Sequence, residues 1–274
     1  RCVVSEFVDD WAEGLTPNPC VECNPCVKFH LLAREADTLG CEASISGHYA
    51  RGRRTDTDCQ LLRGSDVSRD QSYMLYRLSQ RLLARLELPI GSLSKHQVRR
   101  LAGEVGLETA DRPDSQDICF APESDFTGLV GRRHPQAVQP GPILDTEGRE
   151  LGRHRGIASY TVGQRRGLGI GGPEGPWFVL RVQPERNAVI VGAESDLWVE
   201  RAEVRRLHLI GEVTGDSFEA TVMTRYRGTE TPAMIQCDGD RAEVRFRRPH
   251  RAPAPGQSAV FYDGERCLGG GVLV

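Results

Sequence analysis

The sequence predicts a protein of mixed class, with an α/β region first, a small and mostly β region in the middle and a β-barrel last. Helix-like and strand-like segments alternate up to about residue 121, as they do in a parallel sheet covered by helices. From about residue 204, six strand-like runs follow one another with turn residues between them, which is typical of a small barrel. We therefore expect three domains, over residues 1–121, 122–203 and 204–274.

The elements of the first region follow from capping residues and from the spacing of apolar residues. Asn24 and Pro25 form a helix start, apolar residues recur after them at helical spacing, and Gly40 ends the helix. Ser94 caps another helix, which ends at Gly106. The segments expected here are helices over 24–39, 70–86 and 94–106 and strands over 41–46 and 117–120.

Short strands and turns dominate the rest of the chain. A short helix is expected over 124–130, and turn residues at 145–148 and 184–187 join strand-like runs, of which 177–182 and 188–191 flank the second turn. The six barrel strands are predicted over 204–210, 217–224, 232–237, 242–247, 257–262 and 267–273.

Composition excludes several classes of protein. The 274 residues are 39% hydrophobic and 27% charged, as in globular proteins, and no apolar run approaches the ~18–20 residues of a membrane-spanning helix. Nine cysteines without a secretion signal indicate reduced thiols in a cytoplasmic protein rather than a disulfide framework. The first residue is Arg1 rather than Met, so we expect the sequence to begin partway into a longer protein.

One stretch of the chain is locally basic. The net charge is −3, and only Lys28 and Lys95 are lysines among the 35 basic residues, which genome composition alone can explain. Between Arg132 and Arg166, however, seven arginines stand against three acidic residues. A basic stretch in an acidic chain is typical of a protein that binds an anion or a nucleic acid.

Three cysteines, Cys20, Cys23 and Cys26, lie within seven residues. With His30 they offer four nominal zinc ligands, and cysteines at such spacing also occur in iron–sulfur proteins. Cys23 directly precedes the expected helix start at Asn24, where a helix dipole lowers a thiol pKa and favours a nucleophile. Metal binding, thiol catalysis and a structural role all remain open on these residues.

Three further segments carry candidate chemistry. Cys119 ends the strand expected over 117–120, where sheet proteins place ligands, although a single strand cysteine is usually inert. Arg165 and Arg166 lie in a glycine-rich segment without a Walker pattern, which fits a nucleic-acid backbone contact better than a tight β-bend. Residues 225–227 combine two arginines with a tyrosine, which suits single-stranded RNA as well as a solvated strand.

Taken together, these segments resemble the bacterial tRNA-specific 2-thiouridylases. The matching blocks occur in family order over essentially the whole chain. The two cysteine blocks and the Gln-Arg-Arg-Gly-Leu-Gly block are highly specific. The blocks are residues 16–24, 28–29, 46–51, 69–73, 114–120, 160–172, 224–227 and 255–262.

The resemblance implies a fold and an activity. The first region is expected to be the C-terminal half of a Rossmann-like ATP-pyrophosphatase domain, in an enzyme that adds sulfur at C2 of wobble uridine 34 in tRNA. ATP, with magnesium, would adenylate the C2 oxygen. A persulfide on the residue matching Cys119, charged by a sulfur-carrier protein, would then deliver sulfur. The residue matching Cys23 would assist its release and end in a disulfide with Cys119.

Binding residues are implied in the same way. Gly47 matches an ATP contact of the family, and no membrane partner is expected. The tRNA contacts, with the two arginines of the glycine-rich segment included, are expected at Asn18, Pro19, Cys20, His48, Arg69, Asp70, Gln71, Arg165, Arg166, Arg225, Tyr226 and Gln257.

Two departures from the family pattern leave alternatives open. The family's Ser-Gly-Gly-x-Asp-Ser loop, which cradles the ATP phosphates, does not occur in this sequence, so the alternative is a truncated tRNA-binding remnant without catalysis. Cys20 stands where many members carry Asp. An iron–sulfur cluster on Cys20, Cys23 and Cys119 is therefore the other alternative.

We expect the 274-residue protein alone neither to hydrolyse ATP nor to thiolate tRNA. The phosphate loop supplies backbone donors that the glycine-rich segment around Arg165 and Arg166 cannot replace. Nucleoside mass spectrometry after incubation with tRNA, ATP and a sulfide donor measures the product, and a relative that contains the loop is the positive control. ATP-dependent 2-thiouridine formed by this protein alone would contradict the expectation.

Overall fold

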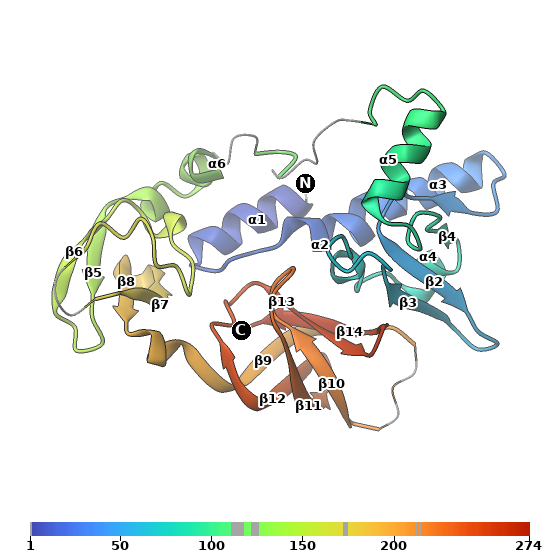
Figure 1. Ribbon diagram of the computed structural model, residues 1–274. Helices are drawn as coiled ribbons and strands as arrows, with labels where there is room; N and C mark the ends of the chain where they lie inside the picture. Colours follow the sequence, from blue (N-terminus) through green and yellow to red (C-terminus); the bar gives the residue numbers. More distant parts are fainter. Residues whose placement is uncertain (1, 111–117, 122–125, 172–174, 212, 214) are drawn as a thin grey trace.

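The computed structural model describes residues 2–110, 118–121, 126–171, 175–211, 213 and 215–274. Figure 1 shows mixed α/β elements on one side, a small sheet on the other and a barrel below them. Helix α1 (Cys2–Ala12) runs between the first two parts. The expected combination of α/β structure, a small β part and a final barrel is thus confirmed.

The α/β part has short helices around a two-stranded parallel sheet. Its strands β1 and β4 pair in parallel, with Ser44 opposite Leu86. The elements are α2 (Pro19–Cys23), the π-helix η1 (Asn24–Lys28), α3 (Phe29–Thr38), β1 (Ser44–Ile45), the 3₁₀-helix η2 (Ser72–Met74), α4 (Gln80–Leu83), β4 (Leu86–Glu87) and α5 (Lys95–Glu104).

The first predicted helix begins earlier than expected. The sequence offers two Asn-Pro pairs, and the helix starts at the first of them, with Pro19 near its first position. Asn24 is buried instead, and its side-chain amide donates to the Met74 carbonyl at 2.8 Å. The chain then continues through η1 into α3. The predicted helix start at Asn24, directly after Cys23, is therefore wrong.

The helix expected over 70–86 is also wrong. The structure has only the single turn η2 and the four-residue α4, whose cap Ser79 accepts a hydrogen bond from the Leu82 amide at 3.4 Å. The Tyr73 hydroxyl donates to the Ser258 carbonyl at 2.8 Å and the Tyr76 hydroxyl to the Ser258 hydroxyl at 3.2 Å. Contacts with the barrel thus override the helical spacing of the leucines.

The other predictions for the α/β part have mixed outcomes. The helix expected over 94–106 is confirmed as α5, where Ser94 and Gln97 form a capping box with bonds of 3.2 and 2.7 Å. The strand expected over 41–46 shortens to β1. In place of the strand expected over 117–120, residues 118 and 121 form an isolated bridge with Cys119 in the turn, and residue 117 lies outside the described residues.

The middle part is a four-stranded sheet in the order β6-β5-β8-β7. Both predicted turns are confirmed, since they join β5 to β6 and β7 to β8. Phe7 and Trp11 of α1 share the core of this part. The expected helix over 124–130 corresponds to α6, and residues 124 and 125 lie outside the described residues. The elements are α6 (Phe126–Arg133), η4 (Pro135–Val138), β5 (Gly141–Leu144), β6 (Glu150–His154), η5 (Ile157–Ser159), β7 (Phe178–Gln183), η6 (Pro184–Arg186), β8 (Ala188–Gly192) and η7 (Glu194–Leu197).

Six strands close the barrel in the order β13-β10-β11-β12-β9-β14, and pairing of β13 with β14 completes the ring. Buried and exposed side chains alternate along β11 and β12, as the sequence pattern predicted. All six predicted strands are confirmed, with somewhat different bounds. They are β9 (Trp198–Leu209), β10 (Ser217–Met223), β11 (Glu230–Asp238), β12 (Arg241–Arg251), β13 (Ser258–Asp263) and β14 (Arg266–Leu273).

A hairpin that the sequence did not predict joins the α/β part to the barrel. Its strands are β2 (Ala50–Arg54) and β3 (Cys59–Arg63), and β3 pairs with β14, with Leu61 opposite Cys267. One hydrophobic core contains Leu61, the tyrosines after β3 and Tyr262 of β13. A continuous sheet and a continuous core therefore connect two parts that are distant in sequence.

Close packing at this junction requires glycine at position 91. A Cβ atom on Gly91 would lie 1.8 Å from the carbonyl oxygen of Ala50 in β2. We expect Gly91→Ala to lower the free energy of unfolding by about 3 kcal/mol, because the backbone must move. The matched control is Gly103→Ala in α5, where the added Cβ meets no atom within 4 Å and should stabilise by up to ~1 kcal/mol. Guanidinium titrations measure both, and equal effects would contradict the argument.

Candidate functional site

The cysteine helix α2 lies beside α1 and presents thiols at its surface. Cys20 and Cys26 are exposed, and Cys23 is partly buried. Cys23 is the last residue of α2, so the prediction that it lies at the positive end of a helix is wrong. Cys20 occupies the first turn instead.

Cys119 interacts electrostatically with Cys20 of α2. It is exposed and free, and its neighbour Phe120 contacts Phe7 of α1 with ring centroids 5.3 Å apart. Desolvation by the surrounding protein raises the pKa of the Cys20 thiol, Lys28 lowers it, and the Cys119 and Cys23 sulfurs raise it again. Cys20 is therefore within electrostatic reach of both other cysteines.

The described residues do not assemble a metal site around these thiols. Among them, no group of three or more His, Cys, Asp or Glu side chains is placed to hold a metal ion. Cys26 lies in the π-helix and His30 is exposed on α3.

His48 is held as a neutral ring next to this site. Its Nδ1 atom lies 2.7 Å from the Ser46 hydroxyl, and its ring contacts Phe29 with centroids 5.5 Å apart. Burial, with a smaller contribution from Lys28, lowers the pKa of His48 to about 4. The Lys28 charge lowers the pKa of both His48 and Cys20. Gly47 between β1 and His48 is exposed.

The segment before α2 contacts the barrel. The Asn18 amide lies 3.7 Å from the Met74 sulfur, and Pro19 is buried. Gln257 of the barrel donates to the Thr16 carbonyl at 2.8 Å. Two of the expected tRNA-binding segments, around Asn18 and at Gln257, therefore lie side by side although they are far apart in the sequence.

Asp70 and Gln71 have partners inside the protein. The Asp70 carboxylate accepts bonds from the Gly64 amide at 2.9 Å and from the Ser72 hydroxyl at 2.8 Å. The Gln71 side chain accepts from the Tyr49 amide at 2.9 Å. These two side chains stabilise the loop between β3 and η2, and Asp70 is buried.

The 225–227 segment forms the loop after β10 rather than part of a strand. The Tyr226 ring contacts Tyr73 at 5.9 Å, and the Arg227 guanidinium lies 5.0 Å from its centroid. Burial raises the pKa of Tyr226, and Arg69 and Asp70 are close enough to act on it. Arg225 is exposed beside this ring. Arg69 and the 225–227 loop thus form one surface, while Arg165 and Arg166 are exposed in the glycine-rich loop of the middle part.

One ion-pair network at the site was missed by sequence reasoning. Glu22, between Cys20 and Cys23, pairs with Arg77 and, at 3.1 Å, with Arg206 of the barrel. Arg206 also pairs with Glu6 of α1. Its φ angle is +55°, a conformation that costs energy for a residue with a side chain. No local pattern marks residues that meet across the whole length of the chain.

We expect His48 to make stability depend on pH. The ring is protonated in the unfolded chain below pH ~6.5 but stays neutral in the folded protein down to its pKa of about 4. Stability should therefore fall by about 1–3 kcal/mol as pH drops from 6.5 towards 4. His48→Gln should remove this part of the slope, while His30→Gln, on exposed α3, keeps it. Urea titrations across this pH range compare the three proteins, and identical slopes would contradict the assignment.

Comparison with known proteins agrees with this arrangement. Family models match residues 1–123 (tRNA methyl transferase HUP domain), 130–193 (tRNA methyl transferase PRC-barrel domain) and 199–273 (aminomethyltransferase beta-barrel domain). The tRNA-specific 2-thiouridylase MnmA of Chloroflexus aggregans is 48% identical over 99% of this chain and 76% of its own length. Those of Roseiflexus castenholzii and Rhodospirillum centenum are each 45% identical, over 99% and 100% of this chain and 78% and 72% of their own lengths. With these matches and with its thiols gathered beside α2, the chain belongs to the tRNA-specific 2-thiouridylase family.

Proposed function

We propose that this protein transfers sulfur to C2 of uridine 34 in cytoplasmic tRNA by a persulfide route, once the family's loop for the ATP phosphates, which this sequence lacks, is supplied. The observation that supports this is the group of free thiols, in which Cys20 is within electrostatic reach of both Cys23 and Cys119. Cys119 is exposed, so a sulfur-carrier protein has access to it. Family membership supports the reaction type, and the exposure of Cys119 and the electrostatic interaction of Cys20 with both other thiols support a thiol site here.

The chemistry divides into three steps. The C2 oxygen of the uridine attacks the α-phosphate of ATP and pyrophosphate departs, so the adenylated oxygen becomes a leaving group. The terminal sulfur of a persulfide on Cys119 attacks C2, and AMP departs. The Cys23 thiolate then attacks the Cys119 sulfur, which breaks the S–S bond, releases the thiolated base and leaves a Cys23–Cys119 disulfide. A thiol reductant restores both cysteines for the next cycle.

We assign ATP binding to the segment after β1 that contains Gly47. This exposed glycine adjoins the neutral ring of His48, and magnesium would arrive with the ATP phosphates. Because the described residues do not converge as metal ligands, no step is assigned to a magnesium ion or an iron–sulfur cluster.

Binding of tRNA is assigned to several surfaces. The Asn18–Cys20 segment and Gln257, which lie side by side, would face the target base. The exposed arginines of the glycine-rich loop and the Arg225–Arg227 loop would contact RNA phosphates and bases. Asp70 and Gln71 would act indirectly, by holding the loop that carries Arg69. In this scheme residues 1–121 carry the thiols, and residues 122–203 and 204–274 complete the tRNA surface.

Thiol mapping tests the persulfide route on the protein itself. We expect mild oxidation to form a Cys23–Cys119 disulfide, because the route requires Cα atoms within ~4.4–6.8 Å of each other. We also expect a small-molecule persulfide donor to add one sulfur atom to Cys119. Both outcomes should persist in Cys20→Asp and in the control Cys41→Ser, which alters an exposed cysteine elsewhere. Peptide mass spectrometry measures both products.

Two results would contradict this assignment. One is a Cys20–Cys119 disulfide in place of the expected pair. The other is iron in the anaerobically purified protein that disappears in Cys20→Asp, which would favour the three-cysteine cluster. Replacement of Cys119 by serine should abolish sulfur loading and the disulfide together.

A further inference from the structure

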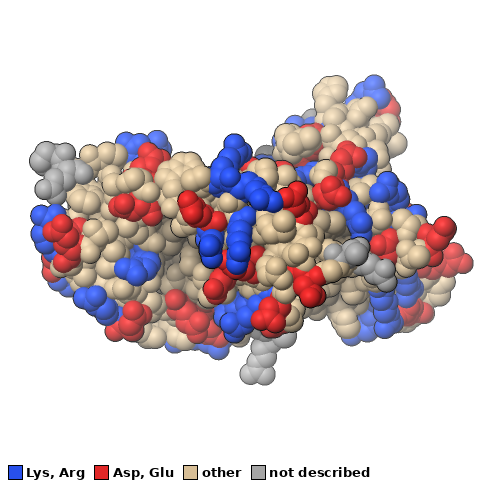
Figure 2. Space-filling view, turned by 90° about the horizontal axis from the view of Figure 1, so that it is seen from below, with Lys and Arg blue, Asp and Glu red and all other residues tan. Residues whose placement is uncertain are grey.

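Many arginines of the described residues form ion pairs with acidic side chains. Figure 2 shows the two signs of charge interleaved over one face, with a group of basic side chains near its centre. In the locally basic stretch the structure separates paired from unpaired arginines. Those with acidic partners are Arg133 with Asp9 at 3.1 Å, Arg149 with Asp145 at 2.6 Å and Arg153 with Glu150 at 3.7 Å.

Arg132 and Arg155 differ from these neighbours. Within the described residues neither guanidinium has an acidic partner or a hydrogen bond, and both residues are exposed. Each is one or two positions from a paired arginine, so sequence position alone does not explain the difference. Their charges are therefore available to an external anion.

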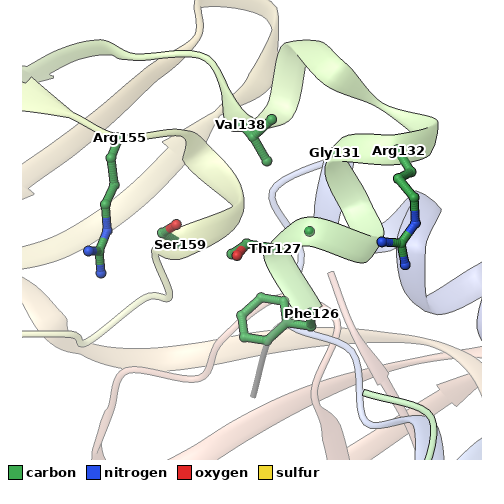
Figure 3. Close-up of a pocket in the computed structure, with 8 residues that line it drawn as sticks. Phe126, Thr127, Gly131, Arg132, Val138, Arg155 and Ser159 are labelled. Carbon is green, nitrogen blue, oxygen red and sulfur yellow. The ribbon is translucent and has the colours of Figure 1, made fainter. Parts of the chain in front are cut away.

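The two arginines border one concavity in the middle part. It lies between α6 and η5 and has a volume of about 780 Å³. Figure 3 shows Arg132 and Arg155 on opposite sides, with the side chains of Thr127 and Ser159 between them. Gly131 allows α6 to pack closely against Val138, since a Cβ at position 131 would lie 3.0 Å from a Val138 methyl group.

The chemistry of this lining selects an extended anion. Two guanidinium groups on opposite sides suit two negative groups better than one, and each offers a planar fork of donors to phosphate oxygens. The hydroxyls of Thr127 and Ser159 add neutral donors between the cations, and Phe126 supplies an apolar ring at the edge. No carboxylate lines the concavity among the described residues. A polyanionic chain with regularly spaced phosphates matches this pattern.

We propose that the concavity between α6 and η5 binds the phosphodiester backbone of tRNA, through Arg132 and Arg155. This inference rests on the proposed tRNA function. It adds a tRNA contact at residues that lie outside the sequence blocks shared with the family. The site is separate from the thiols of α2 and from Arg165 and Arg166. It positions the RNA and carries no sequence information, because its donors meet phosphates rather than base edges.

Salt-dependent tRNA binding tests the proposal on the 274-residue protein. The probe is an unmodified tRNA that contains uridine 34, and fluorescence anisotropy is measured over a series of salt concentrations. The test variant is Arg132→Gln with Arg155→Gln. Each lost phosphate contact should reduce the slope of log affinity against log salt by about 1 and weaken binding about tenfold near 0.1 M salt.

The chain itself offers a matched control. Arg133→Gln with Arg153→Gln removes the same total charge from neighbouring positions, but these arginines already pair with Asp9 and Glu150. The control should therefore keep most of the wild-type slope. Arg132→Lys with Arg155→Lys should restore most of the affinity, because lysine supplies the same positive charge. The remaining deficit reflects the planar guanidinium group, which lysine lacks.

The possible results separate the two levels of inference. If wild-type protein binds tRNA with a steep salt slope and the test and control variants lose the same amount, the concavity is not a tRNA site, while the proposed function stands. If wild-type protein shows no tRNA binding at low salt, both fail. The unfolding curves of the Arg132 and Arg155 variants should coincide with that of the wild type, since among the described residues neither guanidinium has an ion pair or hydrogen bond to lose.

Discussion

The pairing of Glu22 with Arg77 and Arg206 is the contact on which the geometry of the thiol site depends. The Glu22 side chain is only 15% exposed, so its charge requires compensation from both arginines. Arg77 comes from the α/β part, and Arg206 comes from β9 of the barrel. The helix that bears Cys20 and Cys23 is thus clamped from two sides. The barrel determines the orientation of the thiols as much as their own helix does.

The same logic explains the unusual backbone of Arg206. A positive φ at a residue with a side chain persists only where surrounding contacts compensate for its energy. Here the guanidinium contacts Glu6 of α1 and Glu22 of α2 at once. Asp10, also on α1, has its pKa raised to about 6 by burial and by Glu6. Charge is therefore concentrated where three elements meet, and Arg206 holds them together.

Sequence reasoning succeeded where structure is determined locally and failed where distant contacts decide it. The barrel strands and α5 follow from alternation and from the Ser94 capping box, and both are confirmed. The helix over 70–86 failed because Tyr73 and Tyr76 bond to Ser258 of the barrel. The helix start failed because Asn18 and Asn24 are each followed by proline, and only burial of Asn24 distinguishes them.

For the candidate site, the thiols were predictable and their support was not. Cysteine spacing pointed to Cys20 and Cys23, and family blocks added Cys119. The pair Glu22–Arg206 spans 184 positions, and no periodicity reports such a contact. Likewise, the free arginines of the basic stretch could be separated from the paired ones only in three dimensions. The roles of the site residues and the domain bounds remain predictions.

The β3–β14 pairing has a consequence for how the protein matures on the ribosome. Arg51 of the hairpin bonds to Glu265 at the opposite end of the chain, 214 positions away. The edge of β3 cannot be covered until β14 has been synthesised, because β14 is its partner. Contacts of such high sequence separation slow folding. Until β14 has emerged, the chain carries an open strand edge, and termination before β14 would leave it prone to association with other chains.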